Sequence, residues 1–258
     1  MNSMNYKFID THCHLYNEYY NNLEPVLFEA FKNDVNKFFV ASDNISSIGE
    51  VLKLSETYEN IYGCLGIHPD NVFEDYSVLD NIIKNISTSK IIAIGEIGLD
   101  YYHDKNNKKE QIKLFEYQLD LAQKYNYPVV IHSREATQDT INILKKYNLK
   151  GVIHCFNGSY ETAMLYVKMG YKLGINGVIT FKNCNLKDVI KKVGLEHLVL
   201  ETDSPFLAPV PYRGSQNSPK NIKIIALFLA NLFDVSLDEI ARITNKNVKE
   251  IFDIEIGL

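Results

Sequence analysis

The stretch Asp10-Thr-His-Cys-His14 decides between two α/β folds that the rest of the chain leaves open. It directly follows a short apolar run, residues 6–9, which predicts a buried first strand. A doubly wound open sheet normally carries a glycine-rich turn after that strand, because the backbone there must approach a dinucleotide phosphate closely. The stretch contains no glycine and has two histidines instead. It therefore argues against a dinucleotide-binding sheet.

Apolar runs like the first one recur along the chain, with helical patterns between them. They are nearly continuous, which is typical of strands buried on both faces of a parallel sheet. No Gly/Ser-rich linker or charge block divides the chain. Strands alternating with helices over 258 residues predict a single (β/α)8 TIM-barrel domain spanning residues 1–258. The predicted strands are residues 6–9, 37–41, 61–67, 91–94, 128–131, 151–153, 171–175 and 197–200.

The helical patterns are amphipathic. Ile112, Phe115 and Leu119 recur at spacings of three and four residues, which places them on one face of a helix. Ser236-Leu-Asp-Glu239 is a capping-box pattern and predicts the start of the first of two short C-terminal helices. The helices predicted before them are residues 25–35, 111–125, 136–147, 159–169 and 222–233.

Composition and charge limit the classes of function. Hydrophobic residues make up 46% and charged residues 23% of the chain, as in ordinary folded domains and unlike disordered or fibrous chains. The formal net charge of −5 provides no overall basic field, so a polyanionic substrate would need positive charge supplied locally. The longest apolar run, residues 224–230, is far shorter than the ~18–20 residues of a membrane span. The four cysteines form no CxxC pair and follow no secretory signal. We therefore expect a cytoplasmic monomer with reduced thiols and no membrane contact.

Polar side chains gather at the carboxyl ends of the predicted strands. In a barrel these ends all meet at one mouth, where active sites lie. Five of the seven histidines follow a predicted strand in this way, which is unlikely by chance. The residues concerned are His12, His14, His68, His132 and His154, together with the carboxylates Glu96 and Asp203.

Imidazole nitrogens and carboxylate oxygens together are typical ligands of Zn, Mn, Fe or Ni, whereas Mg is less natural for imidazoles. His12 and His14 are two residues apart, so in a strand both can point at one ion. Four histidines and two carboxylates are too many for one tetrahedral ion, but they suit two ions about 3.5–4 Å apart with a carboxylate between them. His68 can belong either to the site or to the scaffold. His103 and His197 are expected on the surface.

Several of these stretches together resemble the TatD family of metal-dependent hydrolases, within the amidohydrolase group of (β/α)8 barrels. The resemblance runs in order from the first strand to about Asn221. It rests on Asp10-Thr-His-Cys-His14, Gly66-Ile-His-Pro69, Gly95-Glu-Ile-Gly-Leu-Asp-Tyr101, Ile131-His-Ser-Arg134, His154-Cys-Phe-Asn-Gly-Ser159, Glu201-Thr-Asp-Ser-Pro205, Leu207-Ala-Pro-Val-Pro-Tyr-Arg-Gly214 and Asn217-Ser-Pro219.

The resemblance implies a deoxyribonuclease that uses two divalent cations (Zn, Mg or Mn) and removes nucleotides from a 3′ end. By the family pattern, His12, His14 and Asp203 bind one ion, and Glu96 bridges. His132 and His154 then bind the second ion. Related amidohydrolases often bridge with a carbamylated lysine, but no lysine follows the matching strand here.

The chain also departs from the family pattern. Asp70 stands where relatives often have a second histidine, and Ser215 and Gln216 fill a gap that often carries a basic residue. Both departures remove positive charge near the mouth and weaken the expected grip on long DNA.

A catalytic mechanism follows as a hypothesis. A water activated between the ions attacks phosphorus, and Asp203 takes its proton. Arg134 and Arg213, two of only three arginines, are predicted to hold phosphate oxygens, with His68 as a further substrate-binding residue. Arg242 is expected on the surface.

The substrate is expected to be DNA or a short nucleotide held at the barrel mouth. Four aromatic residues near the ligand segments are candidates for base stacking or for rim packing: Tyr101, Tyr102, Phe156 and Phe206. Two alternatives stay open. One is a non-nucleolytic hydrolase of a small ester, lactone, amide or phosphoester, and the other is an inactive metal-bound barrel that acts as a binding module.

Overall fold

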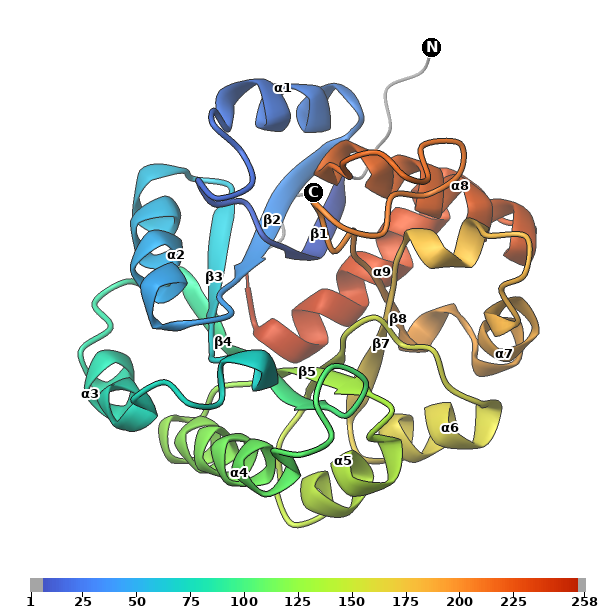
Figure 1. Cartoon of the computed structure of the whole chain (residues 1–258). Coiled ribbons are helices and arrows are strands. Elements are labelled where there is room, and N and C mark those ends of the chain that lie inside the picture. The colour runs from blue at the N-terminus through green and yellow to red at the C-terminus, as the bar shows by residue number, and fades with distance from the viewer. Residues whose placement is uncertain (1–6, 255–258) are drawn as a thin grey trace.

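The computed structural model describes residues 7–254, which fold into eight parallel strands curved into a nearly closed barrel (Figure 1). The strands lie in the sheet in chain order, and each pairs in parallel with the next. The predicted fold class is therefore confirmed. The strands are β1 Phe8–Cys13, β2 Val35–Ala41, β3 Ile61–Leu65, β4 Ile91–Asp100, β5 Val129–Arg134, β6 Gly151–Ile153, β7 Tyr171–Ile175 and β8 Leu198–Leu200. Tyr6, where the predicted first strand begins, lies outside the described residues.

The barrel closes between the end of β1 and the segment that follows β8. The amide of His14 donates to the carbonyl of Ser204 at 2.7 Å, and the amide of Asp203 donates to the carbonyl of His12 at 2.9 Å. These bonds bring residues almost two hundred positions apart to the same point of the mouth.

Helices surround the barrel, as Figure 1 shows. Their apolar faces pack on the outside of the strands in one large core cluster. The helices are α1 Glu24–Lys32, α2 Ile45–Thr57, α3 Leu79–Lys84, α4 Lys108–Tyr125, α5 Thr137–Leu144, α6 Tyr160–Lys168, α7 Leu186–Val193, α8 Ile222–Phe233 and α9 Leu237–Phe252. No helix of the described part combines the length and apolar character needed to cross a bilayer.

The end of the barrel opposite the mouth is filled by a second apolar cluster. Inward side chains such as Ile9 and Phe39 belong to it, and so do Val248 and Phe252 of α9. The rings of Phe39 and Phe252 meet edge to face with centroids 5.0 Å apart. Helix α9 therefore closes this end with apolar packing.

Several predicted bounds differ from the structure: β1 and β5 continue to Cys13 and Arg134, past the predicted ends at residues 9 and 131, and two further predictions were wrong. The C-terminal region forms the single helix α9 and not two short helices, although Ser236 does cap its start. The polar stretch 244–247 continues the helix because tertiary hydrogen bonds satisfy its amides, including Asn245 to the carbonyl of Lys7 at 2.8 Å and Asn247 to the carbonyl of Leu198 at 2.7 Å.

The second error concerns β4, which was predicted to end before Glu96 but continues to Asp100. Gly98 permits this extension: a Cβ there would lie 1.9 Å from the carbonyl oxygen of His132 on β5. Glu96 and Asp100 are therefore both held by a strand and not by a loop.

Candidate metal centre

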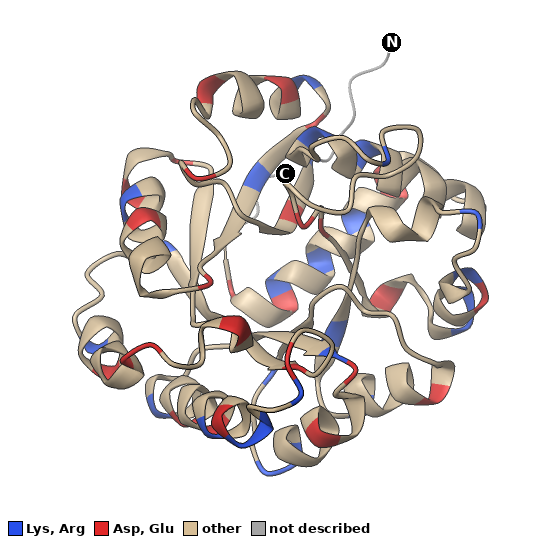
Figure 2. Ribbon diagram, in the orientation of Figure 1, with Lys and Arg blue, Asp and Glu red and all other residues tan. Residues whose placement is uncertain are grey.

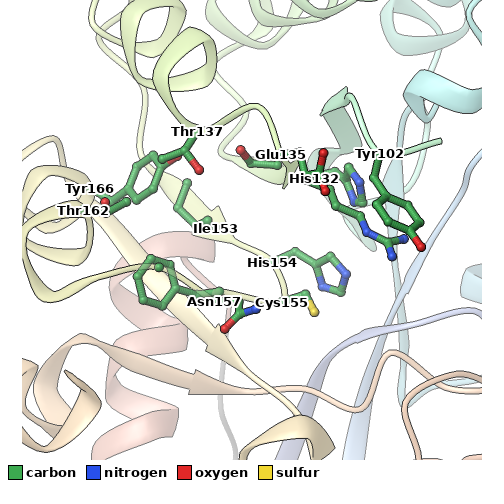
Figure 3. A pocket seen from close by; sticks show the side chains of 14 residues that line it. Tyr102, His132, Glu135, Thr137, Ile153, His154, Cys155, Asn157, Thr162 and Tyr166 are labelled. Carbon is green, nitrogen blue, oxygen red and sulfur yellow. The ribbon is translucent and has the colours of Figure 1, made fainter. Parts of the chain in front are cut away.

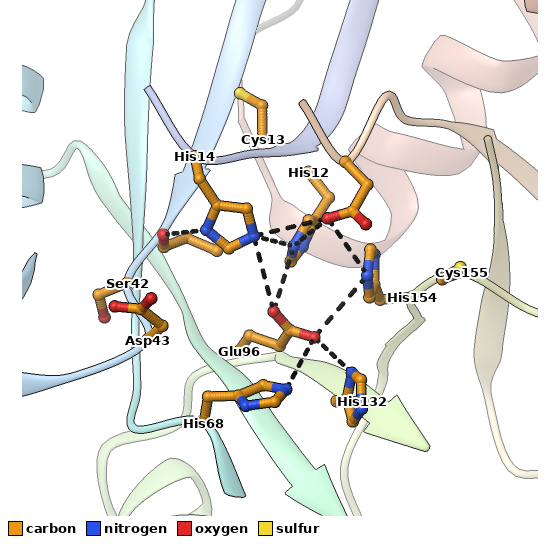
Figure 4. A network of polar contacts seen from close by, with 12 residues as sticks. His12, Cys13, His14, Ser42, Asp43, His68, Glu96, His132, His154 and Cys155 are labelled. Carbon is orange, nitrogen blue, oxygen red and sulfur yellow. Dashed lines mark hydrogen bonds and ion pairs between the residues drawn. The ribbon is translucent and has the colours of Figure 1, made fainter. Parts of the chain in front are cut away.

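Six of the predicted residues meet at the mouth of the barrel (Figure 4). Five different strands, or the residues directly after them, bring these side chains together. All of them are buried except His132, which is half-buried. They are His12, His14, Glu96, His132, His154 and Asp203.

One half of the centre lies between β1 and the segment after β8. His12 Nε2 lies 3.2 Å from His14 Nε2 and 3.3 Å from Glu96 Oε2. Asp203 Oδ1 lies 3.5 Å from His14 Nε2 and 3.7 Å from His12 Nε2. Donor atoms that bind one cation at about 2.1 Å lie about 3.0–3.4 Å apart in tetrahedral or octahedral geometry. These four side chains therefore fit one divalent cation after small movements.

The other half of the centre uses the second oxygen of Glu96. Glu96 Oε1 lies 2.8 Å from His132 Nδ1 and 3.7 Å from His154 Nε2. These three residues form a second group that could hold a metal ion. Figure 4 shows the carboxylate of Glu96 between the two groups, with one oxygen directed at each.

Two carboxylates that sequence reasoning missed orient the histidines. Asp100 Oδ2 lies 3.0 Å from His132 Nε2, and Glu201 Oε1 lies 3.1 Å from His154 Nδ1. Glu201 Oε1 also accepts the amide of Cys155 at 2.7 Å. A carboxylate on the far nitrogen of a metal-binding histidine fixes the ring and raises its basicity. Both residues lie in the motifs quoted above, and that position was the only signal in the sequence.

The charges in the centre favour a bound cation. Burial alone lowers the pKa of His154, but Glu201, Glu96 and Asp203 raise it to about 10. Burial also lowers the pKa of His132, but Asp100 and Glu96 raise it to about 9. Without a cation these rings carry protons, and a divalent cation can replace those protons as the partner of the carboxylates.

A buried network beneath the centre joins β1 to β8. Asp10 accepts the amide of Thr202 at 2.9 Å and its hydroxyl at 2.5 Å. Burial raises the pKa of Asp10 to about 8. The network holds the strand ends that carry His12 and Asp203 in fixed register.

His68 lies beside the centre. Its Nε2 is 3.9 Å from Glu96 Oε1, and its ring meets that of His132 edge to face at 4.4 Å. The amide of Asp70 donates to His68 Nδ1 at 3.2 Å, which leaves Nε2 as the nitrogen that faces the centre. The structure thus brings His68 to the site and not to the scaffold.

The two predicted phosphate-binding arginines differ in position. Arg134 ends β5 and lines a cavity next to the centre. Its guanidinium stacks on the Tyr102 ring at 3.9 Å, and Nη1 lies 3.0 Å from His103 Nε2. Arg213 stacks on Phe181 at 4.4 Å and lines neither of the two cavities at the mouth.

The four candidate aromatic residues divide into two kinds. Tyr101 and Phe156 are each 4% exposed and pack in the protein, whereas Tyr102 is 57% and Phe206 is 47% exposed. Tyr102 and Phe206 also line cavities at the mouth. Phe156 lines the same cavity as Tyr102 despite its burial, so Tyr101 is the one of the four that lines neither cavity at the mouth.

Two cavities open at the mouth and share His132 and His154. The smaller, about 230 Å³, contains the centre, and Asp43 and Asp70 contribute to its wall. The larger, about 530 Å³, lies between the β5 and β6 segments (Figure 3).

The departures from the family pattern leave an acidic mouth. Asp70 lies in the wall of the smaller cavity. Gln216 and Ser215 hydrogen-bond to the carbonyls of Tyr19 and Tyr212 at 2.8 and 2.6 Å. Figure 2 shows acidic and basic residues interspersed over the outer helices. Positive charge for an anionic substrate must therefore come from the centre and its immediate rim.

The barrel and its cluster of histidines and carboxylates define a metal-dependent hydrolase, and comparisons with known proteins agree. Relatives from Buchnera aphidicola and Bacillus subtilis, named uncharacterized metal-dependent hydrolases BU355 and YabD, are both 39% identical to this chain. The alignments cover 95% of this chain and 99% and 98% of those relatives.

A family model described as TatD related DNase matches residues 9–253, so the chain belongs to the TatD family. The solved structure of YjjV, a TatD homologue from Escherichia coli, has a TM-score of 0.91 at 33% identity and covers 96% of this chain and 98% of that one. A TatD family hydrolase from Entamoeba histolytica has a TM-score of 0.85 at 26% identity, with coverage of 97% and 99%.

Proposed function

We propose that the protein is a deoxyribonuclease that hydrolyses phosphodiester bonds with two divalent cations and removes nucleotides from a 3′ end. The observation that carries the proposal is Glu96, whose two oxygens face separate groups of histidines. Two-cation sites of this kind clamp the attacking and leaving oxygens of a phosphoryl group. The family model's description, TatD related DNase, supports DNA as the substrate.

In this proposal His12, His14 and Asp203 would hold one cation, His132 and His154 would hold the other, and Glu96 would contribute one oxygen to each. The bound cations supply a hydroxide at neutral pH and neutralise charge on the phosphoryl oxygens. Zn, Mn and Mg are the candidates, and the four imidazoles favour Zn or Mn.

Asp203 accepts the proton of the attacking water. All three of its contacts with histidine nitrogens use Oδ1, so Oδ2 is the oxygen left to take a proton. Its position is fixed by the bond from its amide to the carbonyl of His12. Arg134 and His68 flank the centre and donate to phosphate oxygens. Arg213 stacks on Phe181 and lines neither cavity at the mouth, so it is the weaker candidate for this contact.

The substrate is held at the mouth of the single barrel domain predicted for residues 1–258. The acidic rim limits the grip to a few nucleotides, because the favourable charges are confined to the cations and Arg134. We further propose that the enzyme works in the cytoplasm as a monomer.

A non-nucleolytic hydrolase is the second candidate, and the acidic mouth favours it. Asp43 and Asp70 line the same cavity as Glu96 and would repel a long polyanion. The same residues and cations would also serve hydrolysis at a carbonyl group, so a small ester, lactone, amide or phosphoester would then be the substrate.

An assay with labelled oligonucleotides tests the proposal. The purified protein, stripped of metal and reloaded with Zn, Mn or Mg, is incubated with single strands labelled at the 3′ or the 5′ end. We expect stepwise shortening of the 5′-labelled strand and early release of the 3′ label, with no reaction by Glu96→Gln. Cleavage of a lactone or amide panel without any effect on DNA would instead establish the second candidate.

A further inference from the structure

The larger cavity beside the metal centre has no role in the chemistry described above. It adjoins the centre, since His132 and His154 line both cavities. Its volume of about 530 Å³ falls within the ~300–1,000 Å³ of small-ligand sites. Figure 3 shows His132 and Tyr102 at one end and Thr162 and Tyr166 at the other. A group attached to a phosphate at the centre can therefore extend into it.

The lining of the cavity suits a flat group that is apolar on its faces and polar at its edge. Ile153 and Phe156 supply apolar wall, and Thr137, Thr162 and Asn157 supply hydroxyl and amide groups. A nucleobase has this character, because its ring stacks on apolar side chains while its edge donates and accepts hydrogen bonds.

Asn157 belongs to the His154–Ser159 motif but has no role in the proposed metal chemistry. It is exposed and lines the cavity, and within residues 7–254 its side-chain amide has no hydrogen-bond partner. An amide offers one donor edge and one acceptor, which is the pattern that reads a base edge.

The rim of the cavity is held in place by neighbouring side chains. Arg134 is fixed between the Tyr102 ring, at 3.9 Å, and His103 Nε2, at 3.0 Å. It lines the cavity next to His132, so one cation is held where the sugar–phosphate link of a bound nucleotide would pass.

Building on the proposed function, we propose that this cavity binds the base of the nucleotide next to the scissile phosphate, with Asn157 at the edge of the base. A base in this cavity lies between the β5 and β6 segments with its edge against protein, so it cannot be paired at the same time. The base must therefore leave any duplex stack, which costs least at a single-stranded or frayed end. The cavity thus makes a strand end the preferred substrate.

A binding experiment tests the cavity without relying on turnover. Calorimetry compares a deoxynucleoside 5′-monophosphate with 2-deoxyribose 5-phosphate, which has the same phosphate and sugar but no base. We expect the nucleotide to bind the metal-loaded protein about tenfold more tightly. Equal affinities for the two ligands would overturn the inference.

Two variants place the effect in the cavity. Thr162→Phe fills it from α6, and Asn157→Ala removes the amide without breaking a hydrogen bond within residues 7–254. In both variants the affinity for the nucleotide should become nearly equal to the affinity for 2-deoxyribose 5-phosphate. Asn231→Ala, an exposed asparagine on α8, is the matched control and should keep the wild-type ratio. An unchanged ratio in both cavity variants would overturn the assignment of the base to this cavity.

A cleavage experiment separates failure of this inference from failure of the proposed function. Oligonucleotides carry one base-less unit at the last, second-last or third-last position of the 3′ end. The inference is supported if a base-less unit at one of these positions slows cleavage by the wild-type protein. In Asn157→Ala the base-less and complete substrates should then be cleaved at the same rate. Equal cleavage of all substrates overturns it while the nuclease proposal stands. If no oligonucleotide is cleaved, the proposed function fails, and the calorimetric ratio still decides whether the cavity binds a base.

Discussion

The two ends of the barrel are built from the same strands but have opposite chemistry. At the end closed by α9, Phe39 and Phe252 belong to an apolar cluster with no charged member. At the mouth, Glu96 and Asp203 are buried among histidines, where desolvation of charge costs free energy unless a partner is present. The closed end is expected to determine stability and the mouth to determine chemistry, and variants at the two ends should separate these properties.

The largest effect is expected from Glu96→Gln. The amide keeps the size of the side chain but loses the charge that faces both groups of histidines. Hydrolysis should fall by at least about 10³-fold, since charge stabilisation by a metal contributes several kcal/mol. Thermal unfolding of the metal-free protein should still be cooperative, which checks that the variant folds. A variant that retained wild-type rates would refute the bridging role.

Phe252→Ala at the closed end is expected to lower stability and to leave activity unchanged. Removal of this buried ring should lower the free energy of unfolding by about 3–5 kcal/mol. Denaturant unfolding measures the loss, and the specific activity of the folded fraction at low temperature should stay at the wild-type level. A large loss of specific activity in fully folded protein would show that the two ends are coupled.

Glu201→Gln and Asp100→Asn test the residues that orient the histidines. Each variant keeps a hydrogen-bonding group near its histidine but removes the negative charge. Metal affinity or activity should fall by about 10–100-fold, less than for Glu96→Gln. Metal titration with a competing chelator measures the change. Wild-type affinity in both variants would limit these carboxylates to a structural role.

The smallest expected effect is a change in KM, and it should differ between variants of the two arginines. Arg134→Ala should raise KM for an oligonucleotide by about tenfold with a smaller change in kcat, because a charge-assisted contact to phosphate is lost. Arg213→Ala is the control and should change KM less, because Arg213 lies against Phe181 away from the cavities. The reverse order would show that the loop carrying Arg213 moves onto the substrate.

The fold and the candidate metal centre were predictable from sequence because they follow local rules. His12 and His14 share a direction through the period of a strand, and each predicted metal-binding residue lies in or directly after a strand that ends at the mouth. The length of β4 was not predictable, because it depends on how closely Gly98 approaches His132 on the next strand.

The remaining parts of the site depend on tertiary contacts that no spacing reveals. Glu201 is recognisable only as a carboxylate near Asp203 until its contact with His154 is seen. Arg134 and Arg213 each lie in one of the motifs quoted above, but of the two only Arg134 lines a cavity at the mouth. Side-chain exposure likewise separates Tyr102 from Tyr101 only in the folded chain.

The central claim is that the mouth binds two cations with Glu96 between them. The most direct test is the number of metal ions per chain, measured by elemental analysis after stripping, reloading with Zn or Mn and removal of unbound metal. The account predicts about two equivalents in the wild-type protein and one or fewer in Glu96→Gln. A fully active wild-type protein with a single equivalent would contradict it.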